Sequence, residues 1–406
     1  MLALLPAAAT AASNDPLRSH QWGLDMVHAD DAHAVTTGAG AVVAVVDTGI
    51  DAAHADLQGR VLPGYDFVDN DGTPQDGEGH GSHVAGVIAA DANNGVGVDS
   101  VAPGAKILPV RVLGDNGSGT SSAVASGIDW ATNHGADVIN LSLSGQIPLG
   151  GLGGEADIDA AIGRALDRGV VVVAAAGNDT LPLCENNSFQ GRVLCVGAVD
   201  KRGNRSFYSS FGQGLGLVAP GGSSLPGTDE DVLSTWNDGQ YEYLAGTSQA
   251  TPHVAGVAAL LVSLGVRGQA AVQRILATAT DAGPPGPDAQ FGAGIVNAAA
   301  AVSDLGTESG PRSQSPAAVK LRSRQRIRSV LRRGVQVTCP AACSVVVKAR
   351  RTTIARGGPA LAVTARLTRA GKKALTAALR RHRTLTATAT ITLRGAKLKR
   401  KLRLVP

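Results

Sequence analysis

Four near-continuous apolar runs limit the folds open to this chain more than any other feature. They are AVVAVVD (41–47), AKILPVRVL (105–113), ADVINLSL (136–143) and GVVVVAAAGN (169–178). Strands that are apolar on both faces belong in a parallel sheet that is covered on both faces. Stretches of helical periodicity lie between the runs, at 80–92, 121–135 and 155–169. This alternation predicts an α/β domain of three layers, with a parallel sheet between two layers of helices.

The charge of the chain divides it into two parts. The 406 residues carry 37 Lys and Arg against 33 Asp and Glu, but residues 304–406 hold 25 of the basic residues and only two of the acidic ones. An acidic body with a basic tail is typical of modules that meet different surroundings. Hydrophobic periodicity is lost over 304–318. We expect a main domain at 14–303, a linker at 304–318 and a second domain at 319–406.

The basic tail has the pattern of a small β-rich domain. β-Branched residues recur in GVQVTC, CSVVVKA, LAVTARL and LTATATITLR, with one helical stretch at 369–382. Its charge suits an anionic cell-surface polymer, nucleic acid or the acidic body of the chain itself. The tail has no aromatic residue on which bases could stack, which argues against single-stranded nucleic acid. The anionic polymer is the candidate partner, and a solvated spacer is the alternative.

Cysteine usage and the first residues favour export. The cysteines form two local pairs, Cys184 with Cys195 and Cys339 with Cys343, and a disulfide could close the segment between either pair. Reduced structural cysteines are the alternative. Residues 1–13 resemble the last part of a secretory signal whose basic start lies upstream. No stretch reaches the ~20 apolar residues that span a bilayer. We expect a monomer that is secreted or associated with the cell surface.

Polar residues end two of the apolar runs, at the edge of a parallel sheet where ligand sites gather. Asp47 ends the first run and Asn178 ends the fourth. A serine hydroxyl becomes a nucleophile when a histidine takes its proton, an acid orients that histidine and donors stabilise the oxyanion. His80 in GHGSHVAG and Ser248 in GTSQATP supply the missing residue types. The chain therefore holds a complete set for nucleophilic catalysis.

The segments around these residues resemble the motifs of the subtilisin family of serine peptidases. VVDTGID, GHGSHVAG, AAAGN and GTSQATPHVAG stand in the family's order, and the resemblance covers residues 14–303. It implies a subtilisin-like catalytic domain and a secreted endopeptidase that cleaves polypeptides through an acyl-enzyme, with no cofactor in its chemistry. The resemblance also assigns four roles: Ser248 is the nucleophile, His80 the base and then the acid, Asp47 the holder of the imidazole tautomer and Asn178 the oxyanion donor.

Simpler interpretations stand beside this one. Ser248 precedes Pro252, which suits the first turn of a helix, so its hydroxyl could be only a helix cap. His80 and His83 have a spacing that could bind a metal, but no third ligand accompanies them. We expect His83 and His253 to be structural. The competing function is a non-catalytic surface-binding protein on a subtilase scaffold, and the complete set of catalytic residue types argues against it.

Two further segments resemble the family's edge segments, which bind the substrate as an added β-strand. Their residues are Gly117, Ser118 and Gly119 in one, and Ser142, Leu143, Ser144 and Gly145 in the other. Glycine suits such edges because the backbone of the ligand has to come close. Ordinary loops are the alternative. We expect the specificity pocket to include the stretch after Asn178, which holds Cys184 and Cys195.

Oxygen-rich segments resemble the strong calcium site of thermitase-like subtilases. The resemblance assigns side-chain oxygens to Asp15, Asp56 and Asn94, and main-chain carbonyls to Asp91, Val96 and Val98. Ca²⁺ prefers such carboxylate and carbonyl oxygens. A turn rich in Asn and Gly, without a metal, is the alternative.

The chain departs from the family motifs at two positions. Ser82 replaces the usual Thr, which we expect to matter little. Gln249 replaces the usual Met beside the nucleophile, and a thioether is readily oxidised to a polar sulfoxide. We therefore expect this protein to resist peroxide.

Overall fold

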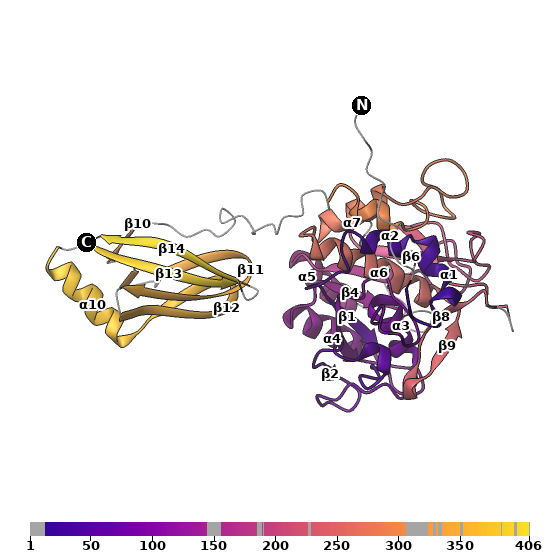
Figure 1. Cartoon of the computed structure of the whole chain (residues 1–406), viewed down its shortest axis with the longest axis horizontal. Coiled ribbons are helices and arrows are strands. Elements are labelled where there is room, and N and C mark those ends of the chain that lie inside the picture. Colours follow the sequence, from indigo (N-terminus) through magenta and orange to yellow (C-terminus); the bar gives the residue numbers. More distant parts are fainter. Residues whose placement is uncertain are drawn as a thin grey trace. The chain divides into compact units, whose positions relative to one another are not determined.

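Two compact units, Met1–Thr307 and Glu308–Pro406, make up the chain (Figure 1). The structure is a computed structural model. It describes residues 13–143, 156–184, 189, 191–225, 229–305, 324–327, 330–331, 335–349, 352–382, 384–393 and 396–405. No helix within these ranges is both long and apolar enough to cross a membrane.

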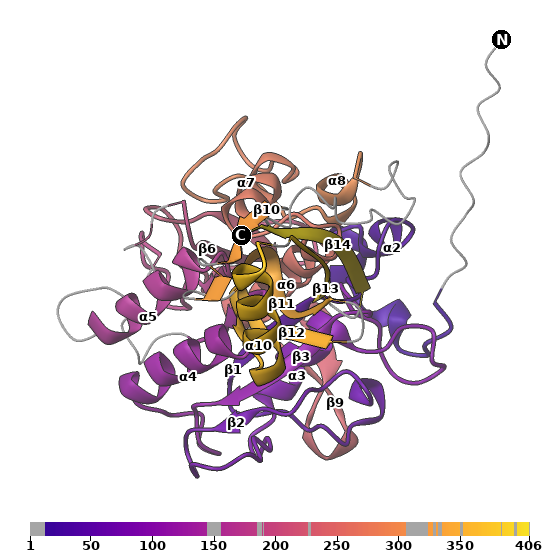
Figure 2. The same ribbon diagram turned by 90° about the vertical axis from the view of Figure 1, so that its left-hand side faces the viewer.

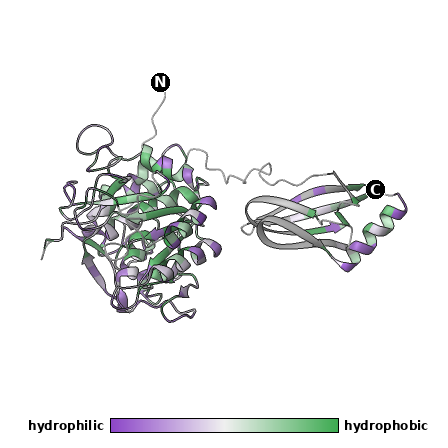
Figure 3. Ribbon diagram, turned by 180° about the vertical axis from the view of Figure 1, so that it is seen from behind, coloured by the Kyte–Doolittle hydropathy of each residue, from purple (hydrophilic) through white to green (hydrophobic). Residues whose placement is uncertain are grey.

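A seven-stranded parallel sheet organises the first unit. In spatial order its strands are β2 (Tyr65–Asp66), β3 (Lys106–Arg111), β1 (Val42–Asp47), β4 (Val138–Leu141), β5 (Val171–Ala175), β6 (Leu194–Val199) and β7 (Leu217–Pro220). The four apolar runs of the sequence form β1, β3, β4 and β5, as predicted. Figure 3 shows these strands as a hydrophobic centre with hydrophilic residues on the outer helices.

Different helices cover the two faces of the sheet. Val43 and Val45 of β1 pack in one cluster with α3 (His80–Ala89) and α6 (Thr247–Ser263). The alternate residues Ala44 and Val46 pack in a second cluster with α4 (Ser121–Asn133) and α5 (Ala156–Asp167), which lie side by side (Figures 1 and 2). Successive side chains of a strand point to opposite faces, so both faces are buried. The three-layer α/β prediction is confirmed.

Helix α6 runs through the core of the unit. Every residue from Thr247 to Val262 is buried, and the helix contacts β1, β4, β5, β6 and β7. A helix that is apolar all round has to be covered on all sides. The smaller elements are α1 (Trp22–Met26), α2 (Ala29–His33), α7 (Gln269–Ala277), α8 (Ala298–Val302) and the hairpin of β8 (Val232–Thr235) and β9 (Tyr241–Leu244).

The second unit is the small β-rich domain that the sequence predicted. Its sheet has the order β10 (Arg324–Arg326), β14 (Ala396–Val405), β13 (Leu385–Leu393), β11 (Val335–Ala349) and β12 (Thr352–Leu367), and α10 (Arg369–Arg380) contacts β12. The stretches GVQVTC and CSVVVKA belong to one long strand, β11. Its pairing with β12 shifts register between Thr338 and Cys343, as at a β-bulge.

Candidate active site

Asp47 and His80 meet at the carboxyl end of β1. Asp47 ends β1 and is fully buried, whereas His80 begins α3 and its side chain is 23% exposed. His80 Nδ1 lies 2.8 Å from Asp47 Oδ1, which also accepts the backbone N–H of Thr48 at 2.8 Å. Because an ionised carboxylate only accepts, His80 donates from Nδ1 and its Nε2 keeps the lone pair. The pair can therefore act as a base through Nε2.

The carboxylates around His80 set its pKa. Burial by itself lowers the pKa of His80, but the charge and hydrogen bond of Asp47, with the charges of Glu78 and Asp76, raise it to about 9. The Glu78 carboxylate also accepts the backbone N–H of His80 at 2.7 Å. Only neutral His80 can accept a proton, so its pKa makes it a base for alkaline conditions.

A buried carboxylate that no motif pointed to fixes the start of α3. Asp76 Oδ1 accepts the hydroxyl of Thr48 at 2.9 Å and the N–H of Gly79 at 2.7 Å. Its Oδ2 accepts the N–H and the hydroxyl of Ser82 at 2.8 and 2.6 Å. Asp76 thereby ties the end of β1 to the start of α3. An acidic residue just ahead of a helix is the sequence signal that could have identified it.

The same contacts explain why Ser82 can stand where the family usually has a threonine. Its hydroxyl donates to Asp76 and accepts the N–H of Asp51 at 2.8 Å, and the residue is fully buried. Threonine carries the same hydroxyl, so both residue types can make these bonds.

The turn before α3 requires a glycine. Gly79 has a φ of 120°, which other residues rarely adopt, and a Cβ there would lie 2.2 Å from the ring of Trp236. A larger residue would displace the start of α3 and His80 with it.

Ser248 lies at the second residue of α6 and is tied to the end of β4. Its hydroxyl donates to the carbonyl oxygen of Ser142 at 3.2 Å, and the Ser142 hydroxyl donates to the carbonyl oxygen of Ser248 at 2.7 Å. Asn140 donates to the Ser142 hydroxyl at 2.9 Å. Among the described residues, Ser248 makes no hydrogen bond with His80. Catalytic hydrogen bonds are often long or poorly aligned in the free enzyme and tighten with substrate.

The helix-cap interpretation of Ser248 does not agree with this placement. Helix α6 begins at Thr247, with Gly246 as its N-cap, so Ser248 lies inside the helix and its hydroxyl bonds to the β4 end. Pro252 consequently lies beyond the first turn, not in it as expected. Proline has no N–H for the carbonyl oxygen four residues earlier, which is that of Ser248. The Ser142 hydroxyl satisfies this carbonyl oxygen instead.

Asn178 follows β5 and faces the start of α6. Its Oδ1 accepts the N–H of Thr247 at 2.9 Å and the Thr247 hydroxyl at 3.0 Å. These bonds fix the orientation of the amide. A Cβ at Gly246 would lie 3.6 Å from both Asn178 Nδ2 and the backbone N of Ser248, so both donors border the space beside Gly246. An oxyanion needs donors near the nucleophile, and these two groups are of the right kind.

The segments expected to bind substrate lie in two different settings. Gly117, Ser118 and Gly119 form an exposed turn after β3, in which the Ser118 carbonyl accepts the N–H of Gly114 at 2.9 Å. Ser142 and Leu143 follow β4 and are buried. Ser144 and Gly145 lie outside the described residues. Of these residues, the structure brings Ser142 into contact with the expected nucleophile.

A disulfide joins Cys184 and Cys195, as the sequence suggested for this pair. It links the segment after Asn178 to β6, where both sulfurs are buried. The side chains of Cys339 and Cys343 are outside the part of the chain that is described.

The other two histidines near the site form hydrogen bonds with backbone carbonyl oxygens. His83 Nε2 lies 3.0 and 3.1 Å from the carbonyl oxygens of Val232 and Glu242, and His253 Nδ1 lies 2.9 Å from that of Gln249. Burial lowers the pKa of His83 to about 3 and that of His253 to about 4. Both rings are therefore neutral, and their contacts are those of structural residues.

The side chains expected to bind calcium come together at the loop 91–98. Asp15 accepts the N–H of Asn94 at 3.0 Å, and Asp56 accepts the Asn94 amide at 2.9 Å and the N–H of Val98 at 2.9 Å. Both carboxylates are buried, and neither forms an ion pair within the described ranges. Two buried carboxylates without a basic partner fit a hard cation.

Two details of this cluster bear on the expected ligands. The Asp91 side chain pairs with Arg60 through one of its oxygens, and the ligand assigned to this residue is its main-chain carbonyl. Asn94 directs its nitrogen to Asp56, and its Oδ1 accepts the N–H of Val96 at 2.7 Å. Ligation through the Asn94 oxygen therefore requires its amide to turn.

Comparisons with known proteins agree with the fold. The model of the subtilase family matches residues 38–294. Thermitase of Thermoactinomyces vulgaris is 44% identical over 253 residues, which is 62% of this chain and 86% of thermitase. A thermophilic serine proteinase of Bacillus sp. (strain AK1) is 43% identical over 249 residues, 61% of this chain but only 59% of that relative.

A solved structure extends the likeness to three dimensions. It belongs to the proteases of Pseudoalteromonas arctica PAMC 21717, with 37% identity and a TM-score of 0.66, and the match covers 73% of this chain and 100% of the solved one. With the family model matching more than half of the chain, this protein belongs to the subtilase family and is a subtilisin-like serine protease.

Proposed function

We propose that this protease cleaves polypeptides through an acyl-enzyme formed on Ser248. The supporting observation is the bond from His80 Nδ1 to Asp47, which leaves Nε2 as the base. Nε2 takes the proton of the Ser248 hydroxyl as Oγ attacks the scissile carbonyl carbon. The same proton passes to the leaving amine as the peptide bond breaks. A water molecule, deprotonated by His80, then attacks the ester, and Ser248 recovers its proton.

The negative charge that develops on the carbonyl oxygen needs fixed donors. We assign this role to Asn178 Nδ2 and the backbone N–H of Ser248, which both border the space beside Gly246. Thr247 holds the Asn178 amide through two hydrogen bonds, so the donor is oriented before substrate binds. Donors that need no reorientation are worth more in a site that excludes water.

Peptide binding is assigned to the edges beside this site. The turn with Gly117, Ser118 and Gly119 is exposed and lies after β3, and Ser142 and Leu143 lie after β4. A peptide that adds as a strand between such edges would bring its carbonyl to Ser248. The bonds between Ser142 and Ser248 couple the second edge to the nucleophile.

Hydrolysis of casein tests the assignment. The full chain is compared with Ser248→Ala and with Ser263→Ala, a matched change at the far end of α6. We expect the wild type and Ser263→Ala to cleave casein and to react with a serine-directed organophosphate, and Ser248→Ala to do neither. Cleavage by Ser248→Ala would overturn the mechanism. A folded wild type without activity would favour the non-catalytic surface-binding protein.

Ca²⁺ is proposed as a structural ion at Asp15, Asp56 and Asn94, with carbonyl oxygens from the loop 91–98. The two buried carboxylates support it, because a divalent cation would supply the opposite charge that the described residues do not. The ion would hold the loop to the start of the chain. It has no part in the chemistry, which rests on the catalytic side chains.

The second unit is proposed to bind an anionic cell-surface polymer. Lys348 of β11 pairs with Thr388 of β13, which pairs with Lys401 of β14, and both lysines are exposed. Val347, next to Lys348 in β11, and Ala389, next to Thr388 in β13, are buried on the opposite face. One face of this sheet is therefore a polar surface with cations on both sides of a threonine strand, which suits a chain of repeated negative charges.

Binding to an anionic wall fraction, measured at increasing salt, tests this surface. We expect retention at low salt that falls as salt screens the charges, and a clear loss in Lys399→Gln/Lys401→Gln. Lys201→Gln, in the first unit, is the control. Equal retention of both variants would refute the assignment.

A secreted or surface-associated monomer agrees with this partner and with the Cys184–Cys195 disulfide, since disulfides persist in oxidising compartments.

A further inference from the structure

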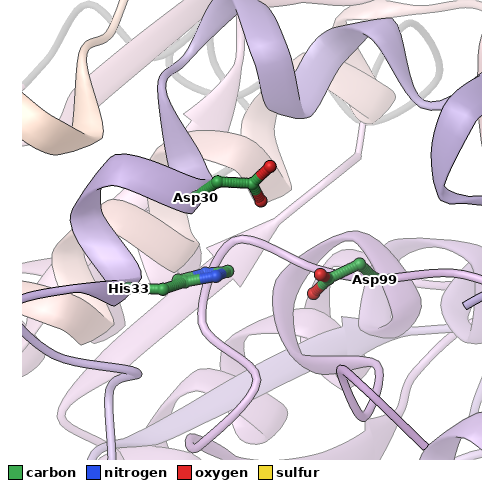
Figure 4. Close-up of side chains that lie close together, drawn as sticks. All are labelled: Asp30, His33 and Asp99. Atoms are coloured by element: carbon green, nitrogen blue, oxygen red, sulfur yellow. The ribbon is translucent and has the colours of Figure 1, made fainter. Parts of the chain in front are cut away.

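Three side chains converge outside the active site. Asp30 and His33 lie one turn apart on α2, and Asp99 lies in the loop between α3 and β3. Figure 4 shows His33 and Asp99 pointing toward each other with Asp30 beside them. One possible ligand atom from each of the three lies within 4.8 Å of the other two. No motif in the sequence pointed to this group.

The hydrogen bond of His33 leaves its ring able to bind a metal. His33 Nε2 lies 3.1 Å from the carbonyl oxygen of Val101, so Nε2 carries the hydrogen in the neutral ring. Nδ1 then keeps its lone pair. A histidine that donates one N–H to a backbone carbonyl and binds a metal through the other nitrogen is a common arrangement in metal sites.

Asp99 is a buried carboxylate with one unpartnered oxygen. It is 1% exposed, its Oδ1 accepts the N–H of Ser100 at 2.6 Å, and no donor among the described residues contacts its Oδ2. A buried, ionised carboxylate without a sufficient opposite charge is costly. A cation beside it would remove this cost.

The local charge matches a divalent ion. Arg18 pairs with Asp25 at 2.6 Å and with Asp30 Oδ2 at 2.8 Å. One guanidinium thus faces three carboxylates, those of Asp25, Asp30 and Asp99, and these groups leave a net charge of −2 when ionised. The Arg18 bond occupies one oxygen of Asp30 and leaves Oδ1 for a ligand.

We propose that Asp30, His33 and Asp99 bind a divalent transition metal ion, Zn²⁺ by the nature of the ligands. One imidazole nitrogen and two carboxylate oxygens, completed by water, suit tetrahedral Zn²⁺. Ca²⁺ takes oxygen ligands and would not use the imidazole, so the site differs in chemistry from the proposed calcium site. The ion would join α2 to the loop at Asp99 and strengthen the packing of the first helices on the unit.

Calorimetric titration with ZnCl₂ tests the site. The full chain with Ser248→Ala, which prevents self-digestion, is stripped of metals and kept in saturating Ca²⁺. We expect one Zn²⁺ per chain and an increased melting temperature. His33→Gln in the same chain should weaken binding by more than the about 10- to 100-fold that follows loss of a residue that only supports a ligand, whereas His28→Gln, an exposed histidine beside α2, should not weaken it. Undiminished binding by His33→Gln, or no saturable binding in the Ser248→Ala chain, would overturn the proposal.

Cobalt gives a measurement that needs no substitution at the proposed metal ligands. Co²⁺ in a tetrahedral site of nitrogen and oxygen ligands absorbs visible light much more strongly than Co²⁺ in water. We expect this band to saturate at one Co²⁺ per Ser248→Ala chain and to disappear after one equivalent of Zn²⁺. Absence of the band, or its persistence with excess Zn²⁺, would also refute the site.

Discussion

The pH dependence of proteolysis should follow the charge on His80. Its pKa of about 9 makes the imidazolium the main form of the free enzyme at neutral pH, and an imidazolium cannot take the proton of Ser248. Two pH units below the pKa, about 1% of the enzyme is active, because the neutral fraction falls tenfold per unit. We therefore expect kcat/KM on a peptide ester or amide to rise tenfold per pH unit from pH 7 and to level off above pH 9.

Glu78→Gln is the perturbation that tests the cause. It removes one of the negative charges that raise the pKa of His80 and leaves an oxygen that can still accept the N–H of His80. We expect the midpoint of the kcat/KM profile to move to lower pH, with the alkaline plateau preserved. Glu230→Gln, which removes a carboxylate paired with Arg202, should leave the midpoint in place.

A plateau that already begins at pH 7 in the wild type would refute the electrostatic reasoning. An unchanged midpoint in Glu78→Gln would show that the charge of Glu78 does not contribute to the pKa of His80. The stability of the fold should fall, whereas proteolysis rises, as the pH increases through this range. A group whose pKa is raised by folding stabilises the native state below its ordinary pKa of 6.5, and this contribution is lost as pH rises through about 9. Denaturant unfolding of Ser248→Ala measures this trend.

Four further outcomes follow from the site and its surroundings. Asn178→Ala should lower kcat about 100- to 1,000-fold with little change in KM, the loss found when such a donor is removed from a subtilisin, and an unchanged kcat would exclude it as the oxyanion donor. Cys184→Ala/Cys195→Ala should lower the free energy of unfolding, measured by urea denaturation, by about 3 kcal/mol, since the crosslink closes a segment with a sequence separation of 11. An unchanged free energy of unfolding would refute the loop-closure estimate. Peroxide should inactivate Gln249→Met faster than the wild type, and equal rates would contradict the expectation. Addition of Ca²⁺ to metal-free Ser248→Ala should raise its melting temperature but not that of its Asp15→Asn/Asp56→Asn form, and an unchanged melting temperature in the former would exclude the calcium site.

The sequence predicted the layers of the fold because strands buried on both faces leave a strong apolar pattern. The run at 41–47 became β1 and the periodic stretch at 121–135 became α4. Short or exposed strands leave a weaker pattern. The two residues of β2, the four of β7 and the half-exposed β9 were therefore not identified. The buried strand β6 was missed as well, because Gly197 interrupts its apolar run.

The proposed catalytic residues could be predicted because their motifs are local, but the residues that hold them in place could not. Asp76 accepts five hydrogen bonds from residues up to 28 positions away, and Ser142 bonds to Ser248 across 106 positions. The cluster of Asp30 and His33 with Asp99 joins segments that are 66 or more positions apart. No local pattern records such pairs, because only the folded backbone brings them together.

The burial of α6 also has a consequence for when the protein becomes active. Ser248 and its oxyanion donor are positioned by a helix that is covered on all sides, and Asp47 lies 201 positions upstream. Contacts of such long sequence separation form late, after most of the chain has collapsed. A newly made or partly folded copy thus has no assembled hydrolytic apparatus. A chain that is still folding therefore cannot cleave itself or its neighbours, and proteolysis begins only with molecules that have completed their core.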